Sequence, residues 1–284
     1  MASWSMRRRM LSIGATALVA AFMVSACGSG GSGGRGDGGG AASAKGGIAL
    51  VNAGKLTTCT HLQFQPFQFN QGAKVVGFDV DVIDLVAKRL GVTQDIIDID
   101  FAPIKSGAVL SSGRCDLAAA GMTITDERRK NIEFSVPYFD ATQALLARKG
   151  SGLTSLGDVK AKNLKIGAQA STTGLEYVKR KGFDPIEFAD SPKELLGLQT
   201  GQADVIVQDL PVVATWLKKP DVRAKYEVVA VLDTGERYGI GMKKGNTALS
   251  KVVNEVIEGA KADGTYDTIY KKWFGTEPSP ATAS

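Results

Sequence analysis

The chain has 284 residues, of which 44% are hydrophobic and 22% are charged, so it can form one large domain or two lobes with separate cores. Its formal net charge is +5, and three of the basic residues lie in an N-terminal segment, 1–26, that contains no acidic residue. The rest of the chain has 31 basic and 29 acidic residues, and this net charge of +2 argues against a nucleic acid as the partner.

The N-terminal segment has the layout of an exported lipoprotein. Three arginines at 7–9 are followed by a mainly apolar run of 15 residues at 10–24, which is too short to cross a bilayer comfortably but typical of a signal peptide. The run ends in Val-Ser-Ala-Cys, which resembles the bacterial lipobox, so 1–26 is the expected signal peptide and Cys27 the expected lipidation site. A signal peptide followed by a chance cysteine is the alternative.

A flexible linker is expected after Cys27. Eleven of the 20 residues at 28–47 are glycine, and such a segment cannot bury enough apolar surface to become ordered. The GSGGSG sequence at 28–33 matches a dinucleotide-binding pattern only formally, because no strand precedes it. No other stretch approaches 18 apolar residues, so we expect a protein that is anchored to the membrane and does not span it.

Strand-like and helical patterns alternate from residue 48 onward. The expected strands are, in chain order, 55–60, 96–101, 116–120, 164–168 and 205–208. The expected helices are 80–90, a short one capped by Thr125, one that opens at 171–174, then 192–200, 211–218 and two near the C-terminus that include 252–257 and 266–273. This alternation predicts an α/β fold with mainly parallel sheets, and favours two α/β units over one continuous sheet.

Few residues are available for catalysis or metal binding. His61 is the single histidine, which excludes multi-histidine zinc patterns, and there is no G-x-S-x-G or P-loop motif. We therefore expect no catalytic residue, metal or cofactor. Cys59 and Cys115 remain as an even pair in an exported protein, so they form either a disulfide or two buried thiols.

Several motifs occur in a characteristic order and together resemble one family. They are FQPFQF at 64–69, GFDVD at 77–81, GMTITDER at 121–128, FSVPY at 134–138, IGAQ at 166–169, STTG at 171–174, DVIVQD at 204–209 and DGTY…IYKKWFG at 263–275. Over residues 55–275 the chain resembles the amino-acid-binding branch of the bacterial extracellular solute-binding proteins. The resemblance implies the two-lobed type II periplasmic-binding fold, in which each lobe is a mainly parallel sheet flanked by helices and two crossover strands form a hinge.

The same resemblance implies domain boundaries. Lobe 1 is expected to comprise residues 48–142 and 238–275, and lobe 2 residues 143–237. A short disordered tail is expected at 276–284. The crossovers are expected near 140–145 and 234–240, with the ligand held between the lobes.

Two charged residues would form the ligand clamp that the resemblance implies. Arg128 would hold the ligand α-carboxylate with its guanidinium fork, and Asp209 would bind the α-ammonium group. Each has a simpler alternative, since Arg128 could be a helix-surface arginine and Asp209 could only cap the helix that follows it.

The remaining implied contacts are polar and aromatic. Thr123 and the backbone of Gly121 would share the carboxylate and ammonium groups, and Phe64 and Phe101 would stack on the ligand. Thr172 and Thr173 lie at an expected helix start, where free N–H groups suit a carboxylate, although both could act only as helix caps.

His61 and Gln169 stand at positions that face the ligand side chain in the family. Many relatives carry an acid where His61 stands, and some carry lysine where Gln169 stands. A pocket without that acid suits a cationic side chain poorly, so we expect glutamate, aspartate, glutamine or another neutral polar amino acid. A role for His61 only in packing at the rim of the cleft is the alternative.

The expected function is capture of an amino acid outside the cytoplasm and delivery to the permease of an ABC importer, by a monomer anchored to the cell membrane through its lipid. An enzyme similar to cyclohexadienyl dehydratase is one alternative, with Asp209 as the candidate general acid. A ligand-sensing module for a signalling partner is the other, although such modules normally continue into a transmembrane or signalling segment.

Overall fold

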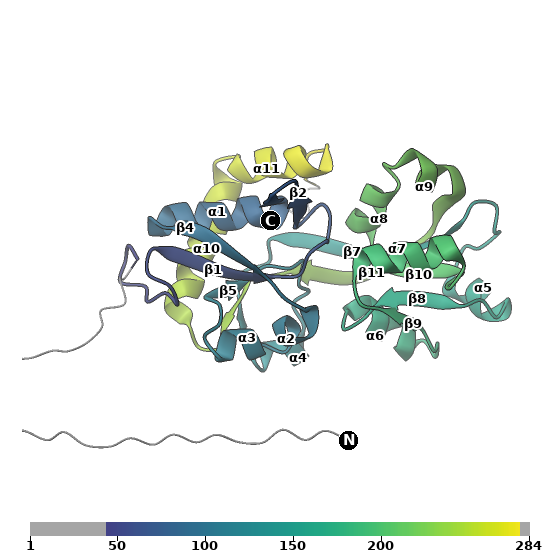
Figure 1. Ribbon diagram of the computed structural model, residues 1–284, viewed down its shortest axis with the longest axis horizontal. Coiled ribbons are helices and arrows are strands. Elements are labelled where there is room, and N and C mark those ends of the chain that lie inside the picture. Colours follow the sequence, from purple (N-terminus) through teal and green to yellow (C-terminus); the bar gives the residue numbers. More distant parts are fainter. Residues whose placement is uncertain (1–43, 279–284) are drawn as a thin grey trace, which may run out of the picture. The chain divides into compact units, whose positions relative to one another are not determined.

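The computed structural model describes residues 44–278, and these belong to one compact unit at 40–284 (Figure 1). The expected signal peptide, Cys27 and most of the expected linker lie outside the described residues. Residues 44–47 were expected to belong to the linker, but they form a turn in which the Lys45 N–H donates to the Leu90 carbonyl at 3.0 Å. Ala44 and Ile48 are buried against the first lobe, so residues 44–47 pack with that lobe.

The sheet of the first lobe has the strand order β4-β1-β5-β12-β6. Its strands are Lys55–Thr60 (β1), Thr93–Asp98 (β4), Leu117–Ala118 (β5), Ile132–Phe134 (β6) and Gly241–Lys243 (β12). β1 is parallel to β4 and β5, whereas β12, which returns from the second lobe, is antiparallel to β5 and β6. A small hairpin of Phe69–Gln71 (β2) and Lys74–Val76 (β3) stands beside this sheet.

Helices cover both faces of the first sheet (Figure 1). They are Phe78–Leu90 (α1), Phe101–Lys105 (α2), Ala108–Ser111 (α3), Asp126–Arg129 (α4), Thr247–Ala262 (α10) and Thr265–Phe274 (α11). α1 buries an apolar stripe that includes Val82, Val86 and Leu90, and it ends at Gly91, whose φ of 72° allows the left-handed C-cap. Leu117 packs in the cluster with α1 and α10, and its neighbour Ala118 packs with α2 and α3, as expected for alternating strand positions.

The sheet of the second lobe has the order β11-β7-β10-β8-β9. Its strands are Phe139–Arg148 (β7), Ile166–Gln169 (β8), Ile186–Phe188 (β9), Val205–Asp209 (β10) and Tyr226–Tyr238 (β11). The helices of this lobe are Leu156–Ala161 (α5), Thr173–Arg180 (α6), Ser191–Thr200 (α7), Leu210–Trp216 (α8) and Pro220–Lys225 (α9). β8 is parallel to β9 and β10, and β7 is antiparallel to β10 and β11.

β7 and β11 are the crossover strands, and they run side by side between the two lobes (Figure 1). Their first-lobe ends meet where Phe139 pairs with Tyr238, and both aromatic rings pack in the core of that lobe. The pairing shifts register between Leu232 and Glu236, where the strands leave the second sheet. This is the predicted α/β, two-lobed type II periplasmic-binding fold.

One predicted strand differs clearly from the structure. The strand expected at 96–101 is β4 at Thr93–Asp98, and Phe101 begins the helix α2. Phe101 and Ile104 are three positions apart and both are buried, which is helical spacing.

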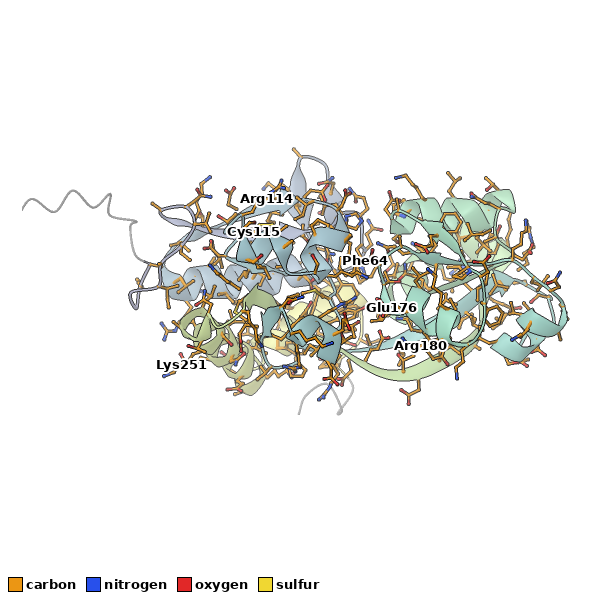
Figure 2. The ribbon with its side chains drawn as sticks, turned by 90° about the horizontal axis from the view of Figure 1, so that it is seen from below. Phe64, Arg114, Cys115, Glu176, Arg180 and Lys251 are labelled. Carbon is orange, nitrogen blue, oxygen red and sulfur yellow. A yellow bond between two sulfur atoms is a disulfide. The ribbon has the colours of Figure 1, made fainter. Side chains whose placement is uncertain are left out.

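Cys59 on β1 and Cys115 just before β5 are joined by a disulfide, with Cα atoms 5.8 Å apart. The parallel pairing of Cys59 with Ala118 brings the two strands together, and both sulfur-bearing side chains are buried in the first lobe (Figure 2). The bond closes a loop that contains α1, β4, α2 and α3.

Candidate functional site

A small cavity lies where the two lobes meet, with a volume of about 20 Å³. Its lining residues are Phe64, Phe101, Ala120, Gly121, Thr123 and Arg128 from the first lobe and Thr172, Thr173 and Asp209 from the second. All except Ala120 were predicted as ligand-binding residues from the sequence. A space of this size holds about one water molecule, so an amino acid can enter only if the lobes separate or side chains move.

The two lobes contact each other at the rim of this cavity. Lys105 Nζ on α2 lies 3.5 Å from Glu176 Oε1 on α6, and Figure 2 shows Phe64 and Glu176 where the two lobes face each other. Deeper in the cleft, the hydroxyl oxygens of Thr123 and Thr173 are 3.4 Å apart. The cavity is therefore bounded by groups from both lobes.

Arg128 is buried at this site, with only 6% of its surface exposed. Its backbone N–H donates to the Thr125 hydroxyl at 3.1 Å, which caps α4, and its Nη1 donates to the Thr123 carbonyl at 2.8 Å. The guanidinium carbon lies 5.5 Å from the centre of the Phe101 ring. Burial lowers the pKa of Arg128, and the negative charges of Glu176, Glu236 and Asp209 oppose that effect. Arg128 is thus a cation aimed inward and not a helix-surface residue.

Asp209 ends β10 and precedes α8, but its side chain does not cap that helix. Its two carboxylate oxygens instead accept hydrogen bonds from Gln143 Nε2 and from the Tyr238 hydroxyl. Burial raises the pKa of Asp209 to about 7 and the charge of Glu236 adds to the effect, whereas Tyr238, Gln143 and Arg128 act in the opposite direction. The site therefore has an anion from the second lobe opposite a cation from the first.

Gly121 forms a tight contact beside the ligand site. Its φ is 54°, and a Cβ atom there would lie 2.7 Å from the Phe64 ring. The Gly121 N–H donates to Asp79 at 2.9 Å, and the Tyr138 hydroxyl donates to the other oxygen of the same carboxylate at 2.7 Å. Burial raises the pKa of Asp79 to about 6, although both hydrogen bonds lower it. Asp79 thus fixes the Gly121 backbone from behind the site.

The two threonines at the start of α6 have different partners. The Thr172 hydroxyl accepts from the Leu175 N–H at 3.2 Å and donates to the Gln169 carbonyl at 2.7 Å, so it caps the helix as well as lining the cavity. The Thr173 hydroxyl donates to Glu236 at 3.0 Å. Capping and cavity lining therefore coexist at Thr172.

His61 and Gln169, which were also predicted to bind the ligand, do not line this cavity. His61 Nδ1 lies 2.9 Å from the Ile99 carbonyl oxygen. Gln169 is buried, and its amide oxygen accepts from Gln208 Nε2 at 3.3 Å. Gln208 also donates to Glu194 at 2.6 Å, and burial raises the pKa of Glu194 well above its usual range. Both predicted residues thus bond to partners within the protein.

The sequence analysis did not identify Glu236, Gln143, Tyr238 or Asp79 as site residues. Tyr238 and Gln143 lie 29 and 66 positions from the Asp209 carboxylate that they bond. They come from the crossover strands, and only the antiparallel pairing of β7 with β10 and β11 brings them to Asp209. The motif GFDVD did contain Asp79, and its helical spacing with Ile83 and Val86, which places a carboxylate on the buried face of α1, was the available signal.

Neither a metal site nor a membrane span is present among the described residues. Between Ala44 and Pro278, no three side chains of His, Cys, Asp or Glu are grouped so that they could hold a metal ion. Within the same range, every helix is too short or too polar to cross a bilayer.

The family model of the bacterial extracellular solute-binding proteins, family 3, matches residues 56–276. The chain therefore belongs to this family, within its amino-acid-binding branch. It is a substrate-binding protein of the type that serves amino-acid ABC transporters.

Individual relatives differ in the amino acid that they bind. The glutamine-binding protein of an ABC transporter from Bacillus subtilis (strain 168) is 30% identical over 280 residues, which cover 96% of this chain and 99% of the relative. An ancestral arginine-binding protein, solved with arginine and with glutamine, is 38% identical with a TM-score of 0.72 and covers 78% of this chain and 99% of its own. An ancestral amino acid-binding protein described as a precursor of cyclohexadienyl dehydratase is 32% identical with a TM-score of 0.71, covering 78% of this chain and 96% of its own.

Proposed function

We propose that this protein is a lipid-anchored receptor that captures a polar α-amino acid between its lobes and delivers it to the permease of an ABC importer. One observation carries this proposal: Arg128 from one lobe and Asp209 from the other line the same buried cavity. An α-amino acid has a carboxylate and an ammonium group on one carbon, and this pair of opposite charges is complementary to both.

The other cavity residues support the same ligand class. Phe64 and Phe101 provide apolar surface for the stem of a ligand, and the hydroxyls of Thr123 and Thr173 add polar contacts close to the charged pair. The pairing of β7 with β11 supports the proposed crossovers near 140–145 and 234–240. Ligand binding would then stabilise closure about these two strands.

The identity of the bound amino acid depends on the residues that face its side chain. Glutamate, aspartate or glutamine followed from the assumption that His61 and Gln169 present donors to the ligand side chain. Neither residue lines the closed cavity, so contact of either one with a ligand side chain stays a prediction. Relatives that bind glutamine or arginine support a polar ligand of neutral or positive charge.

Anchoring through Cys27 is the second part of the proposal. The arginines at 7–9, the apolar run at 10–24 and the following Val-Ser-Ala-Cys support lipidation at that cysteine. The glycine-rich residues that follow would give the folded part a flexible tether of roughly 25 Å.

Calorimetric titration of the full chain with the twenty standard amino acids tests the binding function. We expect at least one amino acid to bind, and Arg128→Ala to weaken that binding by roughly 100-fold or more while leaving the thermal unfolding of the unliganded protein cooperative. Failure of all twenty to bind a folded wild-type protein would refute the proposal. A parallel assay for turnover of arogenate or prephenate should show none, whereas turnover would identify the dehydratase alternative.

A further inference from the structure

Glu236 reaches the candidate ligand site from the crossover strand β11. Its Oε2 atom accepts hydrogen bonds from three side chains: Thr123 at 3.2 Å, Thr173 at 3.0 Å and Gln143 at 3.1 Å. Thr123 and Thr173 line the cavity from opposite lobes. Glu236 is therefore connected to both sides of the site and to the hinge between them.

These hydrogen bonds determine what the neighbouring groups can offer a ligand. A threonine hydroxyl has one proton to donate and two lone pairs. Because Thr123 and Thr173 direct their protons to Glu236, their oxygens can only accept from a further partner. The Gln143 amide nitrogen donates to both Glu236 and Asp209, so its two protons are also in use. This end of the cavity is rich in acceptors and suits an N–H donor.

The charges around the cavity do not balance. Arg128 and Asp209 line the cavity, and Glu236 bonds to the lining side chains Thr123 and Thr173; with both carboxylates ionised, these three groups have a net charge of −1. The nearby Lys105–Glu176 ion pair is neutral as a pair. The α-carboxylate and α-ammonium groups of any amino acid also cancel each other. The net charge of these three groups together with the ligand is therefore zero for a cationic side chain, −1 for a neutral one and −2 for an acidic one.

We propose that Glu236 is a specificity-determining residue whose carboxylate makes the cleft prefer amino acids of net positive charge and reject aspartate and glutamate. The inference rests on the proposed function, since it concerns the ligand of the same site. Uncompensated charge in a buried cleft is costly, so the order of affinity is cationic, then neutral, then acidic.

Titration calorimetry with arginine, glutamine and glutamate at pH 8 tests this assignment in the full chain. We expect arginine to bind at least about tenfold more tightly than glutamate. Glu236→Gln should reduce that ratio by about tenfold or more. Asp233→Asn is the matched control, because it removes the same charge from an exposed position on the same strand, and it should leave the ratio within about twofold of the wild type.

A second variant separates charge from folding. Glu236→Asp retains the negative charge and should retain the preference for arginine, even if the shorter side chain weakens binding overall. Tightest binding of glutamate by the wild type, or an unchanged arginine-to-glutamate ratio in a folded Glu236→Gln protein, would overturn the inference and leave the proposed function intact. Absence of binding by any amino acid would instead refute the proposed function.

Discussion

At the scale of single residues, Arg128 and Asp209 are both buried. Among the described residues, neither of them forms an ion pair within 4.0 Å. Replacing either with alanine leaves one charge of a bound amino acid buried without its partner. We expect Arg128→Ala and Asp209→Ala each to weaken binding by about 3–5 kcal/mol, which is roughly 100-fold or more in Kd. Isothermal titration with the tightest-binding amino acid measures the loss.

Exposed neighbours of the same type provide the controls for this pair. Arg129 follows Arg128 on α4 but is exposed, and Asp221 lies on the surface of α9. Arg129→Ala and Asp221→Ala should keep affinity close to the wild type. If Arg128→Ala or Asp209→Ala bound as tightly as these controls, that residue would not belong to the site.

The pKa of Asp209 predicts the pH dependence of binding. Burial raises this pKa to about 7, with Glu236 adding to the shift while Tyr238, Gln143 and Arg128 oppose it. A ligand ammonium group favours the ionised carboxylate, so it lowers the Asp209 pKa, and binding below pH 7 releases a proton. Affinity should therefore rise as the pH increases from about 5 to about 8, by up to tenfold per unit below 7.

Calorimetry over that pH range, with buffers of different ionisation enthalpy, measures both affinity and proton release. Asp209→Asn should bind weakly and lose most of the pH dependence. Affinity that increases toward low pH would contradict this assignment.

At the scale of secondary-structure elements, the Cys59–Cys115 disulfide ties β1 to the start of β5 across 56 positions of the chain. Closing a loop of this length restricts the unfolded chain and contributes about 4 kcal/mol in the loop-entropy description. We expect the double variant Cys59→Ala/Cys115→Ala to lose about 2–4 kcal/mol of unfolding free energy in urea titrations. An equal stability of variant and wild type, with two titratable thiols in the wild type, would show that the bond does not form.

At the scale of the whole molecule, the crossover strands β7 and β11 predict a hinge motion. The cavity of about 20 Å³ cannot admit an amino acid in this arrangement, so binding requires an open form. A ligand that contacts both lobes then stabilises the closed form through its differential affinity. X-ray scattering should show a smaller radius of gyration when a saturating amino acid is added. Arg128→Ala should show no change at the same ligand concentration, and an unchanged radius in a liganded wild type would exclude closure.

Membrane attachment is the second prediction at this scale, and it concerns residues outside the described part. Cys27→Ser removes the thiol that would carry the lipid, and with it the apolar chains that hold the protein on the membrane. We expect this variant to appear in the soluble fraction, while Ser32→Ala in the neighbouring glycine-rich segment remains with the membrane. Wild-type protein whose mass shows no lipid would contradict the anchor.

The sequence by itself determined the α/β elements through local signals, and its ordered motifs, which resemble the family, indicated the two-lobed architecture and placed Arg128 and Asp209 as the candidate clamp. The apolar spacing and Gly91 predict helix α1, and the Thr125 cap predicts α4. These signals can be read from the sequence because each spans only a few neighbouring residues. Arg128 and Asp209 lie in long motifs at the ends of such elements, so their positions could be predicted without a structure.

Only the tertiary structure decided the surroundings of that clamp. Glu236 bonds to Thr123 across 113 positions, and strand pairing alone brings them together. His61 and Gln169 could be placed near the ligand from the sequence, but their partners, Ile99 and Gln208, come from other segments and were not visible there. A side chain's polar partners are set by packing between distant segments, and this is why the sequence could suggest an acidic or neutral polar ligand without revealing the carboxylate of Glu236 next to Thr123 and Thr173.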